Sequence, residues 1–279
     1  MRIDKNNNMH IEHFWEKIKA DFGYQSPVSP PLFAGKISGW ATFVYYLKLI
    51  NIIINDAKAA DLGNYDIKAW ATGSLATLKI IESVGGKFSI SGLQGVVLHG
   101  GPFVYISNHM SMLDTFILPA ITTAFTKATF VLKDELLEYP VFGKLLKAIN
   151  PISVTRTNPR EDLKTVLHKG CDLISKGYSI IIFPQTTRST VFDPKSFNSL
   201  GVKLAKRAGI PVVPVAVKTD FQCNGRIVKD IGMIDPAKTL YFKFDDPIIV
   251  EGKPQAVHKE VVRFIIKNLS EWGGEVVRG

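Results

Sequence analysis

A histidine and an aspartate stand five residues apart, at His109 and Asp114, directly after the apolar run Phe103 to Ser107. Imidazole titrates near neutral pH, so it suits proton transfer, and a neighbouring carboxylate fixes its tautomer and stabilises the imidazolium. Residues five apart in a helix point about 140° away from each other. We therefore expect His109 in a bend before a helix and Asp114 in the first helical turn, where the carboxylate can reach back to the imidazole.

Ser111 bears on where that helix begins. Ser111 and Asp114 form a Ser-x-x-Asp capping-box pattern, which predicts a helix from Met112. Two other interpretations stay open at this point. Asp114 can simply cap the helix while His109 is an ordinary loop residue, or Ser111 can act as a covalent nucleophile.

The elements that must position these side chains follow an alternating pattern from residue 86 onward. Short apolar runs alternate with stretches of helical periodicity, which predicts an α/β fold with a mixed sheet flanked by helices. The predicted strands are 103–107, 153–155, 179–183, 212–217 and 240–244, and the predicted helices are 112–125, 135–148, 160–176, 197–208 and 255–272.

The first 85 residues have a different pattern, so we divide the chain into an N-terminal helical region, 1–85, and an α/β domain, 86–279. Helices are predicted at 11–22, 32–55 and 65–84. The second is too charged to span a bilayer, because only 11 uncharged residues separate Lys36 from Lys48, whereas a span needs roughly 20.

Two interpretations of this helical region remain. The helices can cover one side of the catalytic core, or they can form a monotopic membrane anchor that places Trp40, Tyr45 and Tyr46 among lipid headgroups. Both can hold together.

Composition narrows the function classes. There are 34 Lys and Arg against 25 Asp and Glu, a net charge of +9 that suits an anionic membrane surface, a phosphorylated substrate or nucleic acid. The aromatic residues lie mainly in apolar runs, so we do not expect nucleic-acid binding. Cys171 and Cys223 lack disulfide or metal-ligand spacing, and we expect no metal. The usual dinucleotide, Walker A, zinc-protease and α/β-hydrolase motifs are absent from the sequence.

Four segments in order carry a family resemblance: "NHMSMLD", "VLKDELLEYPVFGKLLKAINPISVTR", "IIIFPQTTRS" and "GIPVVPVAV". They are similar to the four blocks of the glycerolipid acyltransferase family, typified by bacterial 1-acyl-glycerol-3-phosphate acyltransferase. The resemblance covers roughly residues 103–217. The two-helix N-terminal region also resembles the membrane-docking part of some members.

The resemblance implies an acyltransferase fold and a reaction. His109 would be a general base that takes the proton of an acceptor hydroxyl, which attacks an acyl thioester directly, with Asp114 as its partner. Acyl-CoA or acyl carrier protein would be the co-substrate, with no further cofactor. Lysophosphatidate is the leading acceptor, and glycerol 3-phosphate, a lyso-aminolipid or another lysophospholipid are alternatives. From another class, a non-catalytic lipid-binding membrane protein stays open.

The same resemblance implies a site for the acceptor phosphate. Lys133 and Arg156 match the cations of the second block, and Arg188 matches that of the third. Arginine offers a planar fork to phosphate oxygens, and lysine offers a point charge. Arg188 also follows the apolar strand "SIIIFP", at a strand end where α/β proteins tend to bind ligands.

The third block departs from the family pattern. The family usually has Glu and then Gly where this chain has Gln185 and Thr186. Gln185 keeps the acceptor oxygen but loses the charge, and Thr186 adds a β-branched side chain. We expect Gln185 and Thr187 to contact substrate, and the departure leaves the identity of the acceptor open.

The expected location follows from these assignments. The N-terminal segment "MRIDKNNNMH" lacks the apolar core of a signal peptide, so we do not expect secretion. A peripheral or monotopic position on the cytoplasmic face of the inner (plasma) membrane is expected.

Overall fold

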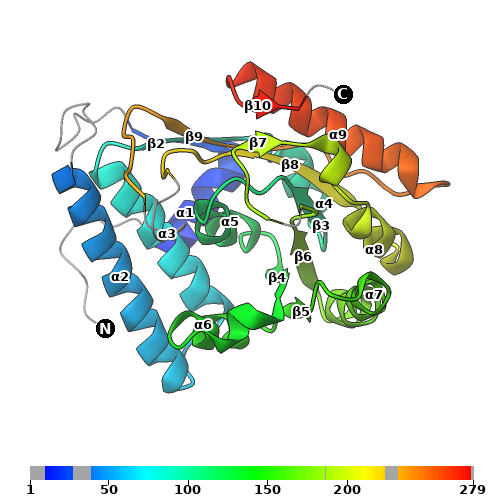
Figure 1. Cartoon of the computed structure of the whole chain (residues 1–279), viewed down its shortest axis with the longest axis horizontal. Coiled ribbons are helices and arrows are strands. Elements are labelled where there is room, and N and C mark those ends of the chain that lie inside the picture. Colours follow the sequence, from blue (N-terminus) through cyan, green and yellow to red (C-terminus); the bar gives the residue numbers. More distant parts are fainter. Residues whose placement is uncertain (1–9, 28–38, 186, 224–231, 278–279) are drawn as a thin grey trace.

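The computed structural model describes residues 10–27, 39–185, 187–223 and 232–277. A mixed eight-stranded sheet lies between two layers of helices, as Figure 1 shows. This confirms the predicted α/β class with a mixed sheet flanked by helices.

The strand order in the sheet is β1-β2-β9-β8-β3-β6-β4-β5. The five strands from β8 to β5 run parallel to their neighbours, whereas β9 is antiparallel to β8, and β1 is antiparallel to β2. A second, two-stranded sheet pairs β10 with β7. The strands are β1 Tyr24–Gln25, β2 Lys87–Ser91, β3 Val104–Ser107, β4 Lys127–Lys133, β5 Ile152–Val154, β6 Tyr178–Ile182, β7 Val191–Phe192, β8 Val212–Lys218, β9 Thr239–Phe244 and β10 Glu275–Val276.

Most of the helices correspond to segments whose apolar residues recur at helical spacing, whereas α4 was not predicted. The α-helices are α1 Ile11–Ala20, α2 Gly39–Asp61, α3 Ile67–Ser83, α4 Gln94–His99, α5 Leu113–Thr122, α6 Phe142–Ala148, α7 Pro159–Ser175, α8 Leu200–Ala208 and α9 Pro254–Glu271. Two short 3₁₀ segments are Asp134–Glu138 and Pro194–Ser196.

Alternation along β3 shows how the sheet divides the interior. Side chains of a strand alternate between its faces. Tyr105 belongs to a core built with α1, α2, α3, α5 and α6, whereas Val104 and Ile106 belong to a core built with α7, α8 and α9. Figure 1 shows α7, α8 and α9 on the side of the sheet away from α2 and α3. Because both faces are covered, β3 is buried along its whole length.

The N-terminal helices share the first of these cores. Phe14, Tyr45 and Leu75 are buried in one cluster with side chains of the sheet, and β1 pairs with β2. The predicted boundary near residue 85 therefore does not separate two cores. Within the described ranges, no helix has both the length and the apolar character needed to cross a membrane.

Several segments differ from the expected elements. The predicted helix 135–148 is broken, because Pro140 separates a 3₁₀ turn from α6, and the predicted helix 32–55 starts partly outside the described residues and continues to Asp61. The sequence reading also missed β4, whose apolar centre "ATFVL" is short and flanked by lysines. This strand matters because Lys133 is its last residue.

Candidate active site

The site lies where neighbouring parallel strands end. β8, β3, β6, β4 and β5 are adjacent and parallel, so their carboxyl ends meet at one edge of the sheet. His109 follows β3, Arg188 follows β6, Lys133 ends β4 and Arg156 follows β5. The topology thus gathers four residues that the sequence analysis selected from separate segments.

His109 and Asp114 are in contact, as predicted. His109 Nδ1 lies 2.8 Å from Asp114 Oδ2, and the aspartate is completely buried. The same oxygen accepts the backbone N–H groups of Met110 at 2.6 Å and Ser111 at 3.0 Å, while Thr219 donates its hydroxyl to Oδ1. The carboxylate is therefore held from several directions, and its position fixes the orientation of the imidazole.

Ser111 takes part in the turn rather than in the cavity. Helix α5 begins at Leu113 rather than at the predicted Met112, and its N-cap Met112 has no side-chain cap bond. Ser111 Oγ instead accepts the Leu113 N–H at 3.1 Å in the turn before the helix. The hydroxyl also donates to Thr219 Oγ1 at 2.9 Å. A buried hydroxyl with these two partners is explained by its structural role, which weakens the covalent-nucleophile interpretation.

Two residues that the sequence reading did not select anchor this turn. Asn108 donates to the carbonyl of Val217 at 2.8 Å and accepts the Val217 N–H at 2.9 Å, so its side chain continues the pairing of β3 with β8. Thr219, just after β8, bonds Asp114 from a position 105 residues away. Asn108 at a strand end is a weak local signal, whereas nothing local marks Thr219.

The other side of His109 is fixed by the third block. The imidazole stacks on Phe183 with ring centroids 4.1 Å apart. The backbone N–H of His109 donates to Gln185 Oε1 at 2.6 Å, and its carbonyl accepts the Ser189 N–H at 3.0 Å. Gln185 is buried and does not line the cavity, so its observed contact positions His109.

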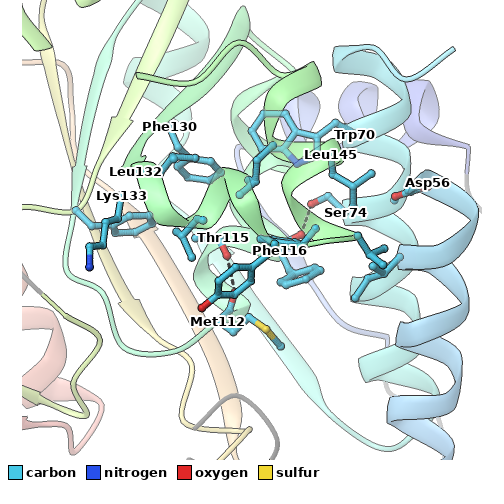
Figure 2. Close-up of a pocket in the computed structure, with 18 of the residues that line it drawn as sticks. Asp56, Trp70, Ser74, Met112, Thr115, Phe116, Phe130, Leu132, Lys133 and Leu145 are labelled. Atoms are coloured by element: carbon cyan, nitrogen blue, oxygen red, sulfur yellow. Dashed lines mark hydrogen bonds between the residues drawn. The ribbon is translucent and has the colours of Figure 1, made fainter. Parts of the chain in front are cut away.

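A cavity of about 500 Å³ opens beside His109. Figure 2 shows part of its wall, including Trp70, Phe116, Phe130 and Leu145. Side chains from α2, α3, α5, α6, β4 and the 3₁₀ turn contribute to the wall. A largely apolar cavity with polar groups beside His109 suits an aliphatic chain attached to a polar reacting group.

The predicted cations lie along the same cavity. Lys133, Arg156, Arg188 and Thr187 all line it together with His109. Lys133 Nζ also contacts Glu135 at 2.6 Å. Thr186 lies outside the described residues.

Arg156 is held by its backbone. It has a positive φ of 61°, and its N–H donates to Asp162 Oδ2 at 2.8 Å. Desolvation lowers the pKa of its guanidinium, and Asp162 opposes that shift. Arginine stays charged at neutral pH because its ordinary pKa lies so far above 7.

A family model matches the segment that contains these site residues. The family model described as Acyltransferase matches residues 89–218, which include His109, Asp114, Lys133, Arg156 and Arg188. Residues 89–218 thus match the acyltransferase family. The acyltransferase match ends at the last residue of β8, so the family segment contains every strand of the parallel group.

Curated relatives agree with this assignment. The chain is 31% identical over 150 residues to 1-acyl-sn-glycerol-3-phosphate acyltransferase of Pseudomonas aeruginosa, covering 54% of this chain and 56% of the relative. It is 27% identical over 180 residues to a chloroplastic 1-acyl-sn-glycerol-3-phosphate acyltransferase of Arabidopsis thaliana, covering 63% and 48%. The chain thus spans about half the length of the curated relatives it matches.

A solved structure shares the acyltransferase fold. The crystal structure of the 1-acyl-sn-glycerophosphate acyltransferase PlsC from Thermotoga maritima aligns with a TM-score of 0.54 and 19% identity. The alignment covers 83% of this chain and 94% of that chain. At this identity the likeness concerns the fold.

Proposed function

We propose that this protein is an O-acyltransferase that moves a fatty acyl group from an acyl thioester to the hydroxyl of a lysophospholipid. Lysophosphatidate is the proposed acceptor, so the product would be phosphatidate. The observation that carries the proposal is that His109, paired with Asp114, lines an apolar cavity together with three cationic side chains. The names of the curated relatives support the same reaction.

The geometry indicates a role for His109 and for Asp114 in the acyl transfer. Nδ1 of His109 is engaged with Asp114, so the other ring nitrogen, Nε2, is left to take the proton of the acceptor hydroxyl. The oxygen attacks the thioester carbonyl and forms a C–O bond. The tetrahedral intermediate then breaks its C–S bond, and the departing thiolate takes the proton from the imidazolium. Asp114 stabilises the imidazolium between these two transfers.

The apolar wall and the cationic side chains would bind different substrates. The apolar wall formed by residues such as Phe130 and Leu145 would hold the fatty chain of the donor. Arg156, Arg188 and Lys133 would bind the acceptor phosphate, because charge-assisted contacts to phosphate are short and directional. Either acyl-CoA or acyl carrier protein is compatible with this division as the donor.

We also propose that α2 docks the protein on a membrane. Five apolar side chains on one stripe of this helix are exposed by 43% to 61%: Trp40, Phe43, Leu47, Ile50 and Ile54. The opposite stripe is buried, and Ile52, Ile53 and Asp56 of the same helix line the cavity. Helix α2 thus carries the exposed apolar stripe on one side and part of the cavity wall on the other. This arrangement suits an enzyme that meets lipid at a bilayer surface. The proposed location is the cytoplasmic face of the inner membrane.

A donor and acceptor panel tests the function. Purified protein is incubated with lysophosphatidate, glycerol 3-phosphate, a lyso-aminolipid or lysophosphatidylcholine, each with acyl-CoA or acyl carrier protein thioester, and products are identified by mass spectrometry. We expect phosphatidate to form fastest. Preference for an acceptor without phosphate would overturn the assignment of the cations, and absence of every acylated product would overturn the function.

A further inference from the structure

The cavity has a polar end that the proposed reaction does not use. Asp56 of α2 lines the cavity, and Figure 2 shows it on the opposite side from Lys133, with Trp70, Phe116 and Leu145 between them. Asp56 is half-buried, because it also faces an outer groove. A carboxylate in such an apolar wall is nevertheless unexpected, since even partial burial of a charge without a partner is unfavourable.

Asp56 has one hydrogen-bond partner among the described residues. Tyr65, itself only 7% exposed, donates its hydroxyl to Asp56 Oδ2 at the long distance of 3.4 Å. Burial raises the pKa of Asp56 from an ordinary 3.8 to about 6, and the Tyr65 hydroxyl opposes this shift. Lys68, which shares an outer groove with Asp56, is instead paired with Glu12. The carboxyl group therefore keeps acceptor capacity that no described side chain uses.

The opposing helix makes room for this group. A Cβ at Gly73 of α3 would lie 2.4 Å from Asp56 Oδ2, so any larger side chain there would displace the carboxyl. Nearby hydroxyls are already engaged, since Ser74 bonds the carbonyl of Phe116 and Thr77 bonds that of Gly73. Asp56 and Tyr65 are thus the polar pair with hydrogen bonds to offer at this end.

We propose that Asp56 and Tyr65 form a subsite for a hydroxyl group carried near the far end of the fatty chain. The inference rests on the proposed function, in which the donor chain occupies the cavity. A hydroxyl donates to the Asp56 carboxyl and accepts from the Tyr65 phenol, whose single proton then turns from Asp56 to the ligand oxygen. A plain alkyl chain that reaches the same place covers both groups and returns no hydrogen bond, which is the unfavourable case for buried polar groups.

The subsite predicts a donor preference. Matched acyl-CoA and acyl carrier protein thioesters of several chain lengths are compared, each with a methyl end or with a hydroxyl at or next to the last carbon. With wild-type protein and lysophosphatidate, we expect kcat/KM for the best hydroxylated donor to exceed that of its plain counterpart by about tenfold, the size of one net hydrogen bond to a charged group.

Variants assign the preference to the subsite. Asp56→Leu should reverse the preference toward plain chains, Asp56→Asn should retain part of it, and Tyr65→Phe should reduce it. Asp61→Asn is the matched control, because Asp61 lies on the same helix, is exposed and pairs with Lys144 outside the cavity wall. If Asp56→Leu does not fold, the assignment is tested by Asp56→Asn and Tyr65→Phe, through the ratio of kcat/KM for the hydroxylated donor to kcat/KM for the plain donor.

The possible outcomes distinguish failure of the subsite from failure of the proposed function. Equal use of plain and hydroxylated donors by wild type, or a preference that survives in both Asp56→Leu and Tyr65→Phe, overturns the subsite while acyl transfer itself persists. Absence of transfer from every donor to every acceptor overturns the proposed function instead, and the subsite with it.

Discussion

Replacing Asp114 by asparagine separates the charge of this residue from its shape. In the structure, Oδ2 accepts two backbone N–H groups and contacts His109 Nδ1, while Oδ1 accepts the Thr219 hydroxyl. In Asp114→Asn the amide oxygen can take the first position, and the NH₂ group can donate to Thr219 if that hydroxyl turns toward Ser111. The turn before α5 should therefore persist and His109 should keep its tautomer.

What the variant loses is negative charge beside the imidazolium. A hydrogen bond to a charged group contributes about 1.5 to 3 kcal/mol. If this contribution is present only in the transition state, its loss lowers kcat by roughly 10- to 150-fold. The acceptor KM should change little, because Asp114 is completely buried and is not part of the cavity wall.

The assay compares initial rates of phosphatidate formation at saturating acceptor and donor, together with thermal unfolding. Asp66→Asn is the control, since Asp66 also caps a helix by accepting a backbone N–H but lies outside the site. A kcat within about twofold of wild type would refute the reasoning, as would a rise in acceptor KM at unchanged kcat. Loss of cooperative unfolding would contradict the hydrogen-bond exchange described above.

Four further predictions concern the site and the exposed stripe of α2. Arg188→Ala should raise the acceptor KM by roughly 10- to 150-fold, with Arg188→Lys recovering only part and the donor KM unchanged; equal effects on both substrates would contradict a phosphate role. Gln185→Glu should keep most activity because it still accepts the His109 N–H, whereas Gln185→Ala should lower Tm by orphaning that group; equal Tm values would count against this contact. A Trp40→Ser, Phe43→Ser double variant should sediment less with anionic vesicles at high salt than wild type, and equal sedimentation would argue against insertion. Folding favours the neutral form of Asp56, so the contribution of this one group to stability is greatest below pH 3.8 and falls as pH rises to about 6; Asp56→Asn should raise Tm at pH 8 and not at pH 3.5, and a gain of equal size at both values would exclude this titration.

The sequence predicted those contacts of the site that depend on the spacing of residues within one short segment. The contact of His109 with Asp114 follows from five residues of chain around one helix start, and it is present. The cations were selected by resemblance, and they line the cavity because they follow neighbouring parallel strands. The strand before Arg188 was predicted from the sequence, whereas the strand that ends at Lys133 was not.

The missing parts depend on pairing between distant segments. Thr219 reaches Asp114 only because β8 lies beside β3, and Asn108 meets Val217 for the same reason. Asp56 gave no signal, because a charged residue in an amphipathic helix usually faces solvent. Only the packing of α2 on α3 and α6 turns it toward the cavity.

The central claim is that His109 is the base in a direct acyl transfer, and the rate of His109→Ala tests it most directly. Wild type and the variant are compared for phosphatidate formation from lysophosphatidate and acyl thioester, with Tm measured for both. We expect kcat to fall by about 10² to 10⁴ while unfolding stays cooperative. Near wild-type turnover by folded His109→Ala would contradict the account.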